Sequence, residues 1–69
     1  MNKTKWGNPT IPITILALKL TEETGEVATE ITDAFMDDDL HADKLLTELD
    51  HVIFIANVLR TRVTSGLAG

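Results

Sequence analysis

Two long stretches of the chain carry apolar residues at the three- and four-residue spacing of one helix face. The first stretch extends from about Ile13 to Met36 and contains no proline. Its apolar positions are Ile13, Leu16, Ala17, Leu20, Val27, Ala28, Ile31, Ala34 and Phe35. The second stretch extends from about His41 to Val63, with an expected inner face of Leu45, Leu49, Val52, Ala56, Leu59 and Val63. The pattern therefore predicts an all-α helical hairpin.

The segments outside the two stretches set the expected boundaries of the domain. Residues 1–12 are expected to form an irregular arm, since proline has no amide donor and Pro12 suits the start of a helix. The sequence MDDDLHAD is interpreted as the turn, in which Asp39 or a neighbouring aspartate caps the second helix. The expected organisation is the arm, a hairpin domain over residues 13–65 and a frayed tail over residues 66–69.

The second helix is apolar around nearly its whole circumference over residues 52–59, VIFIANVL. One partner helix cannot cover such a segment, because a helix that is hydrophobic on all sides is buried on several of them. A chain of 69 residues also buries only a modest part of its surface by itself. We therefore expect a homodimer in which two hairpins form a four-helix bundle, or a homotetramer. The alternative is that the chain is a fragment whose missing helices provide the cover.

Charge and composition exclude several classes of partner. The net charge is −5 with six lysine and arginine residues, which argues against binding to a nucleic-acid backbone. No cysteine is present, and no apolar run approaches the length required to span a bilayer. The first residues do not have the pattern of a secretory signal. The protein is accordingly expected to be soluble and cytoplasmic, with neither nucleic acid nor membrane among its partners.

Four glutamates lie close together in the stretch KLTEETGEVATEI of the first helix. At 100° per residue, Glu22 points toward solvent, whereas the other three form one stripe beside the apolar face. These three are Glu23, Glu26 and Glu30. Glu48 and His51 flank the inner face of the second helix in the same way. By itself a solvated helix face is the commoner explanation of such glutamates, but carboxylates that face one another also suit a hard divalent cation such as Mg²⁺.

The glutamates also form part of a motif. KLTEETGEVATEI followed by LLTELDHVIFIANVL resembles the MazG-like nucleoside triphosphate pyrophosphohydrolases, an all-α superfamily that includes dimeric dUTPases and the phosphoribosyl-ATP pyrophosphohydrolase. The family signature is E-E-x-x-E on one helix and E-x-x-D on a later helix. Glu22, Glu23 and Glu26 match the first half, and Glu48 matches the first acid of the second half. The KWG of the arm resembles the segment that precedes the first helix in some members.

The sequence departs from the signature at its last position. His51 stands where the family has aspartate, and Asp50 lies one residue earlier. A register that uses Asp50 would place Thr47 at the glutamate position, so we favour the register with Glu48 and His51. Imidazole is a poorer ligand for Mg²⁺ than carboxylate, which tilts the expected preference toward Mn²⁺ or another transition metal. The substitution is equally compatible with a weakened or lost activity.

The resemblance implies a house-cleaning enzyme that hydrolyses a nucleoside triphosphate to the monophosphate and pyrophosphate. The metal ligands that it implies are Glu23, Glu26, Glu48 and His51, with Mg²⁺ as the cofactor and Mn²⁺ as an alternative. Glu22 is expected to orient or deprotonate the attacking water, and Lys19 to contact a phosphate oxygen. Lys19 is alternatively an ion-pair partner of Glu23, and His51 a surface or inter-subunit hydrogen-bonding residue.

Two other functions are left open by the sequence. The first is a catalytically degenerate MazG-like module that binds nucleotide or metal without turnover, for which the missing aspartate argues. The second is a structural helical dimer in which the glutamates only make the bundle soluble. No motif identifies the base or sugar of a substrate.

Overall fold

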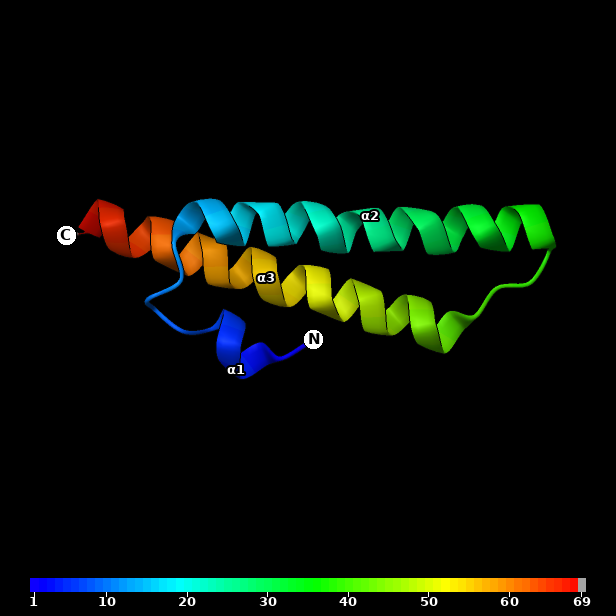
Figure 1. Cartoon of the computed structure of the whole chain (residues 1–69), viewed down its shortest axis with the longest axis horizontal. Helices are drawn as coiled ribbons and strands as arrows, with labels where there is room; N and C mark the ends of the chain where they lie inside the picture. Colours follow the sequence, from blue (N-terminus) through cyan, green and yellow to red (C-terminus); the bar gives the residue numbers. More distant parts are fainter. Residues whose placement is uncertain (69) are drawn as a thin grey trace.

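A computed structural model describes residues 1–68 of the chain. It contains three helices, which are α1 over Lys3–Trp6, α2 over Ile13–Asp37 and α3 over Ala42–Ala68. The two long helices lie side by side and run antiparallel, and α1 lies against α3 (Figure 1). The described part contains no strand and measures 49 × 17 × 16 Å along its principal axes. The predicted all-α hairpin is confirmed for this part of the chain.

The ends of α2 are set by backbone conformation, without a side-chain cap at the start. Pro12 precedes the first helical residue, with φ −62° and ψ 144°, and its carbonyl accepts hydrogen bonds from two amides of the first turn. At the other end Asp38 adopts the left-handed conformation, with φ 54° and ψ 37°. The amides of Asp38 and Asp39 both donate to the carbonyl of Ala34, which closes the helix before the turn.

Two boundaries differ from the sequence-based prediction. The arm is not irregular throughout, because Lys3–Trp6 forms a helical turn in which the side chain of Asn2 accepts a hydrogen bond from a backbone amide at 3.1 Å. Helix α3 continues to Ala68 instead of ending near Val63, so the described residues of the predicted tail are helical. No proline occurs in this segment to force an earlier end. Gly69, the last residue of the predicted tail, lies outside the described residues.

The line along which α2 contacts α3 is not the predicted apolar stripe. The buried residues of α2 are Leu16, Glu23 and Glu30, which are spaced seven residues apart. This line is rotated by about 60° from the predicted stripe at 100° per residue. Ile13 and Ile31 were expected in the contact but are 43% and 52% exposed. Two carboxylates therefore lie in the contact between the helices, where the sequence predicted them to lie beside it.

Helix α3 is rotated in a corresponding way. Ile55 is fully buried, and Glu48 and His51 are half-buried. Leu49 and Val63 were predicted on the inner face but are 37% and 47% exposed. The cause of both rotations is that aliphatic residues cover more than one side of each helix, while a single partner helix buries only one side.

The apolar interior of a single chain is small. Leu16 and Ile55 are the buried apolar residues of the described part. Large exposed apolar side chains occur along both long helices and include Leu18, Ile31, Phe35, Leu46 and Ile53. Most of the aliphatic surface of the hairpin is thus uncovered within one chain. None of the described helices is apolar over a sufficient length to cross a membrane.

The arm is attached to α3 near the open end of the hairpin. The guanidinium of Arg62 donates a hydrogen bond from Nη1 to the carbonyl of Ile11 at 2.7 Å. Farther along the arm, Lys3 Nζ lies 5.5 Å from the centroid of the Phe54 ring, within the range of a cation–π interaction. These contacts hold α1, which includes the half-buried Trp6, against α3. Figure 1 shows α1 beside α3.

Candidate metal centre

The antiparallel register places acidic residues of α2 opposite polar residues of α3. Glu23 faces His51, with 3.5 Å between Oε2 and Nδ1. Glu30, seven residues further along α2, faces Lys44, seven residues earlier on α3, with 3.2 Å between Oε2 and Nζ. Because a seven-residue step is close to two helical turns, both pairs lie along the same contact line. The contact between the two long helices therefore carries two charged pairs, each with a buried glutamate of α2.

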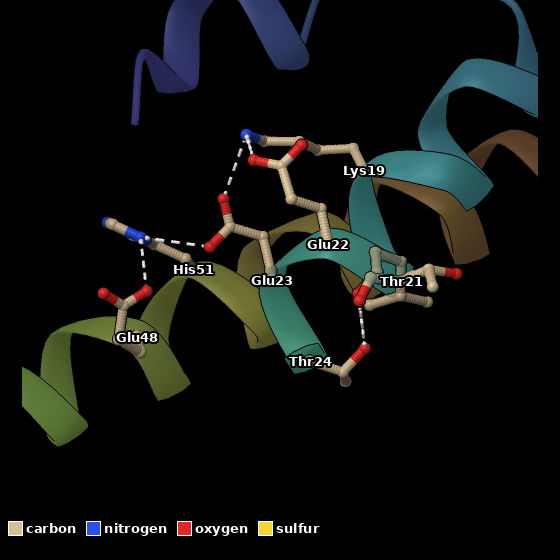
Figure 2. A network of polar contacts seen from close by, with 8 residues as sticks. Lys19, Thr21, Glu22, Glu23, Thr24, Glu48 and His51 are labelled. Atoms are coloured by element: carbon tan, nitrogen blue, oxygen red, sulfur yellow. Dashed lines mark hydrogen bonds and ion pairs between the residues drawn. The ribbon is translucent and has the colours of Figure 1, made fainter. Parts of the chain in front are cut away.

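Glu23 is the most buried charged residue of the described part, with 2% of its surface exposed. Its two carboxylate oxygens face different partners (Figure 2). Oε1 lies 3.1 Å from Lys19 Nζ. Oε2 is directed toward His51 and has no hydrogen-bond partner. A buried carboxylate oxygen without a partner is costly, so this atom is suited to binding a cation.

Glu48 approaches the same point from α3. Its Oε2 is also buried without a hydrogen-bond partner, and it lies 3.9 Å from His51 Nδ1. The ligand atoms of Glu23, Glu48 and His51 all lie within 4.8 Å of one another. Two ligands bonded to one divalent ion at about 2.1 Å are about 3.0–3.6 Å apart, so small side-chain rotations bring the three atoms into one coordination sphere. The donor set fits a divalent cation.

Glu22 and Glu26 extend the acidic cluster along α2. Together with Glu23 they form a second group whose ligand atoms lie within 4.8 Å of one another. The pKa of Glu26 is raised, first because its protonated carboxyl can form a hydrogen bond with Glu48, and second because of desolvation. A carboxyl group that resists ionisation beside other carboxylates indicates an excess of negative charge, which a bound cation would relieve.

An open groove of about 490 Å³ runs beside this cluster. Its charged lining residues are Glu22, Glu26, Glu30, Asp33, Lys44 and Glu48. Five of these six side chains are acidic. An anionic ligand is therefore repelled by the groove unless a cation accompanies it.

The ammonium group of Lys19 neutralises part of the negative charge of the cluster and lies close to the arm. Its Nζ donates a hydrogen bond to Glu22 Oε1 at 3.0 Å and lies 3.1 Å from Glu23 Oε1. The same nitrogen lies 5.1 Å from the centroid of the Trp6 ring. Burial lowers the pKa of Lys19, but hydrogen bonds to Glu22 and Glu23 outweigh it, so the pKa is raised overall. The ion pair expected between Lys19 and Glu23 is present, and Glu22 joins it.

The pairing of Glu30 with Lys44 was not predicted. Glu30 is 8% exposed, and a hydrogen bond to its carboxylate is the first cause of the raised pKa of Lys44. The heptad spacing is the signal that would have revealed this pair. Once residue 23 faces residue 51 in an antiparallel hairpin, residue 30 faces residue 44. The sequence-based prediction placed the glutamates beside the contact between the helices, so it gave no reason to expect an ion pair across that contact.

The alternative register, in which Asp50 replaces His51, has no counterpart in this geometry. Asp50 is exposed and belongs to neither group of candidate metal ligands in the described part. The residues that converge are therefore Glu22, Glu23, Glu26, Glu48 and His51.

Comparisons with known proteins provide no further information about this site. The chain matches no family model, no curated protein and no solved structure. Conclusions about function rest on the residues of the site and on their arrangement.

Proposed function

We propose that the protein is a metal-dependent hydrolase that converts a nucleoside triphosphate to the monophosphate and pyrophosphate. The observation that carries this proposal is the convergence of Glu23 and Glu48, from different helices, each with a buried oxygen that lacks a hydrogen-bond partner. The order of these residues along the chain, E-E-x-x-E and then E-x-x-H, resembles the MazG-like signature and suggests the reaction class.

Glu23, Glu48 and His51 are the residues proposed to hold the ion, with Glu26 at the edge of the same cluster. When bound, Mg²⁺ or Mn²⁺ neutralises phosphate charge and lowers the pKa of a coordinated water. The pKa of Glu26 is raised first by the hydrogen bond that its protonated carboxyl can form with Glu48, then by desolvation and by the nearby charges of Glu48 and Glu22. A cation bound to Glu48 would weaken the first cause and offset the last, so Glu26 would ionise more readily. The mutual repulsion of the carboxylates in this cluster therefore favours the binding of a cation.

Two further residues are proposed to act on water and phosphate. The side chain of Glu22 is 59% exposed and borders the groove, where a carboxylate can accept a proton from an attacking water. Lys19 pairs with Glu22 and Glu23 through one flexible ammonium group, which can exchange a carboxylate oxygen for a phosphate oxygen. In this arrangement the substrate enters the acidic groove together with its metal.

The proposal is tested by measuring pyrophosphate release from a panel of canonical and modified nucleoside triphosphates with Mg²⁺ or Mn²⁺. Glu23→Gln and Glu48→Gln should each reduce turnover by about a hundredfold or more, because each removes a charged ligand. Asp50→Asn is the matched control, since it removes one negative charge from α3 outside the cluster. Turnover that survives both glutamine substitutions would refute the proposed site.

A second function, metal or nucleotide binding without turnover, is favoured by His51 at the position of the family's aspartate. A protein of this kind would be stabilised by Mg²⁺ or Mn²⁺ and would release no pyrophosphate from any nucleotide of the panel. If the ions also leave the thermal unfolding midpoint unchanged, the remaining explanation is a structural helical assembly.

We also propose that two copies pack through one side of the hairpin, here called the apolar face. It comprises Ile13, Ile31, Phe35, Leu49 and Val63, which are between 37% and 85% exposed. At 100° per residue these side chains lie on the side of each contact line away from Glu26 and His51. The face carries no charge among these members and extends along both helices, so a second copy of the same face is its simplest partner. The acidic groove then stays open to substrate.

A further inference from the structure

We propose that the metal centre selects Mn²⁺, Co²⁺ or Zn²⁺ over Mg²⁺, because the imidazole of His51 supplies one of its ligands through Nδ1. This inference rests on the metal centre of the proposed function and concerns which class of ion occupies it. It is independent of whether the occupied site turns over a nucleotide.

The position of the imidazole relative to the two carboxylates carries the inference. His51 Nδ1 lies 3.5 Å from Glu23 Oε2 and 3.9 Å from Glu48 Oε2, and these are the two buried oxygens without hydrogen-bond partners. Hydrogen bonds between nitrogen and oxygen are commonly about 2.7–3.2 Å long, so neither separation is that of a well-formed hydrogen bond. The 3.5 Å separation lies within the range of two atoms that share an ion, and the 3.9 Å separation exceeds that range by about 0.3 Å, which a small side-chain rotation removes.

The three proposed ligands are also restrained by the packing of the two long helices. Glu23 is 2% exposed, and the side chains of Glu48 and His51 are 16% and 18% exposed, so all three are held between the long helices. Figure 2 shows the two carboxylates approaching the imidazole from different helices. Helix-borne ligands position an ion more accurately than ligands on loops. Three protein ligands leave the other positions of the ion open for water or phosphate oxygens.

The chemistry of this donor set disfavours Mg²⁺. Mg²⁺ prefers an octahedron of oxygen atoms and releases its waters reluctantly. Imidazole nitrogen suits transition ions, whose affinity for mixed nitrogen and oxygen sites exceeds that of Mg²⁺. Replacing one carboxylate of an all-oxygen site by His51 therefore lowers the affinity for Mg²⁺ more than the affinity for Mn²⁺, Co²⁺ or Zn²⁺.

The decisive measurement is pulsed electron paramagnetic resonance of the protein loaded with Mn²⁺. We expect modulation from a directly coordinated ¹⁴N nucleus in the unmodified chain and in His41→Asn, and its loss in His51→Asp. His41 is the other histidine of the chain, is exposed and pairs with Asp39 at 3.4 Å, so it is the matched control. Absence of nitrogen modulation from the unmodified protein with bound Mn²⁺ would mean that His51 forms only an ion pair with the carboxylates, and would overturn the inference.

Calorimetric titration with each ion provides a second readout. The ratio of the Kd for Mg²⁺ to the Kd for Mn²⁺ should fall by about tenfold or more in His51→Asp, since that substitution restores an all-oxygen site. An unchanged ratio in a folded His51→Asp protein would contradict the inference. Failure of pyrophosphate release with every ion would instead refute the hydrolase proposal while leaving nitrogen coordination intact, so the two failures are distinguishable.

Discussion

The ammonium nitrogen of Lys19 lies 5.1 Å from the centroid of the Trp6 ring, so the arm covers the cation that pairs with the acidic cluster. Trp6 is the only tryptophan of the chain. Its ring and the carboxylates of Glu22 and Glu23 all lie close to the same ammonium group. We therefore expect a change in the charge of the cluster to alter the fluorescence of this tryptophan.

We expect Mn²⁺ or Mg²⁺ to change the emission of Trp6, because an ion beside Glu23 repels Lys19 and shifts it relative to the ring. Lys19→Met should abolish most of this response. It should also lower the free energy of unfolding of the metal-free protein by about 1–3 kcal/mol, because it removes the positive partner of a buried carboxylate. Fluorescence titration and urea unfolding measure the two effects.

Lys5→Met is the control for this prediction. Lys5 Nζ lies 5.6 Å from the same ring but forms none of the ion pairs of the acidic cluster. Its removal should leave the metal response in place. If the emission of Trp6 changes equally on adding metal in the Lys19→Met protein and in the unmodified protein, the change does not arise from this ammonium group.

Metal-free protein should lose stability as the pH rises above the ordinary pKa of glutamate. The pKa of Glu26 is raised in the folded chain, so its proton contributes stability that is fully present below about pH 4.5 and is lost as the pH rises through the folded pKa. Glu26→Gln should flatten this decline, because glutamine keeps a hydrogen-bond donor toward Glu48 at every pH. The sign of this pH dependence is tested by measuring the thermal unfolding midpoint between about pH 4 and pH 8 with a chelator present.

Saturating Mn²⁺ should reduce the same decline, because an ion bound to Glu48 competes with the hydrogen bond that is the first cause of the raised pKa of Glu26 and offsets the charge of Glu48. Asp50→Asn serves as the comparison, because it neutralises an exposed carboxylate outside the cluster and should not alter the slope. A slope that is equal in the Glu26→Gln protein and the unmodified protein would assign the decline to another group.

Ile31→Glu should dissociate the assembly proposed to form through the apolar face. A carboxylate buried at such an interface without a partner costs about 2 kcal/mol or more in each copy, so the two copies of a dimer together correspond to a Kd weaker by about 900-fold or more. Sedimentation equilibrium measures this change. Leu18→Glu is the matched control, because Leu18 is 66% exposed and lies about 140° from Ile31 around α2. Equal effects of the two substitutions, or a monomeric unmodified protein, would refute this interface.

Asp38→Gly should stabilise the hairpin by about 1 kcal/mol. Asp38 holds a φ of 54°, which costs energy in any residue with a Cβ atom and is free in glycine. The substitution also removes a negative charge from the carbonyl end of α2, where the helix dipole disfavours it. Asp38→Asn separates the two causes, since it removes the charge and retains the side chain. Urea unfolding of both variants should rank glycine above asparagine, with the original aspartate least stable.

The sequence by itself determined the hairpin and the group of residues that form the site. The apolar spacing predicted a helix from Ile13, where α2 begins, and a second long helix after the acidic turn. The spacing of Glu23, Glu26 and Glu30, and of Glu48 and His51, placed each set on one side of its helix. These features follow from local periodicity, which is encoded in the order of residues alone.

Only the tertiary structure decided how the helices are rotated about their own axes. The apolar pattern favoured a contact along the stripe that includes Ile13 and Ile31, but the packed helices place Glu23 and Glu30 in the contact, opposite His51 and Lys44. The reason is that each helix has more aliphatic surface than one partner can bury, so several rotations agree with the pattern. The choice among them depends on long-range contacts between α2, α3 and the arm, and it buries Glu23 and Glu30, which the sequence placed beside the contact.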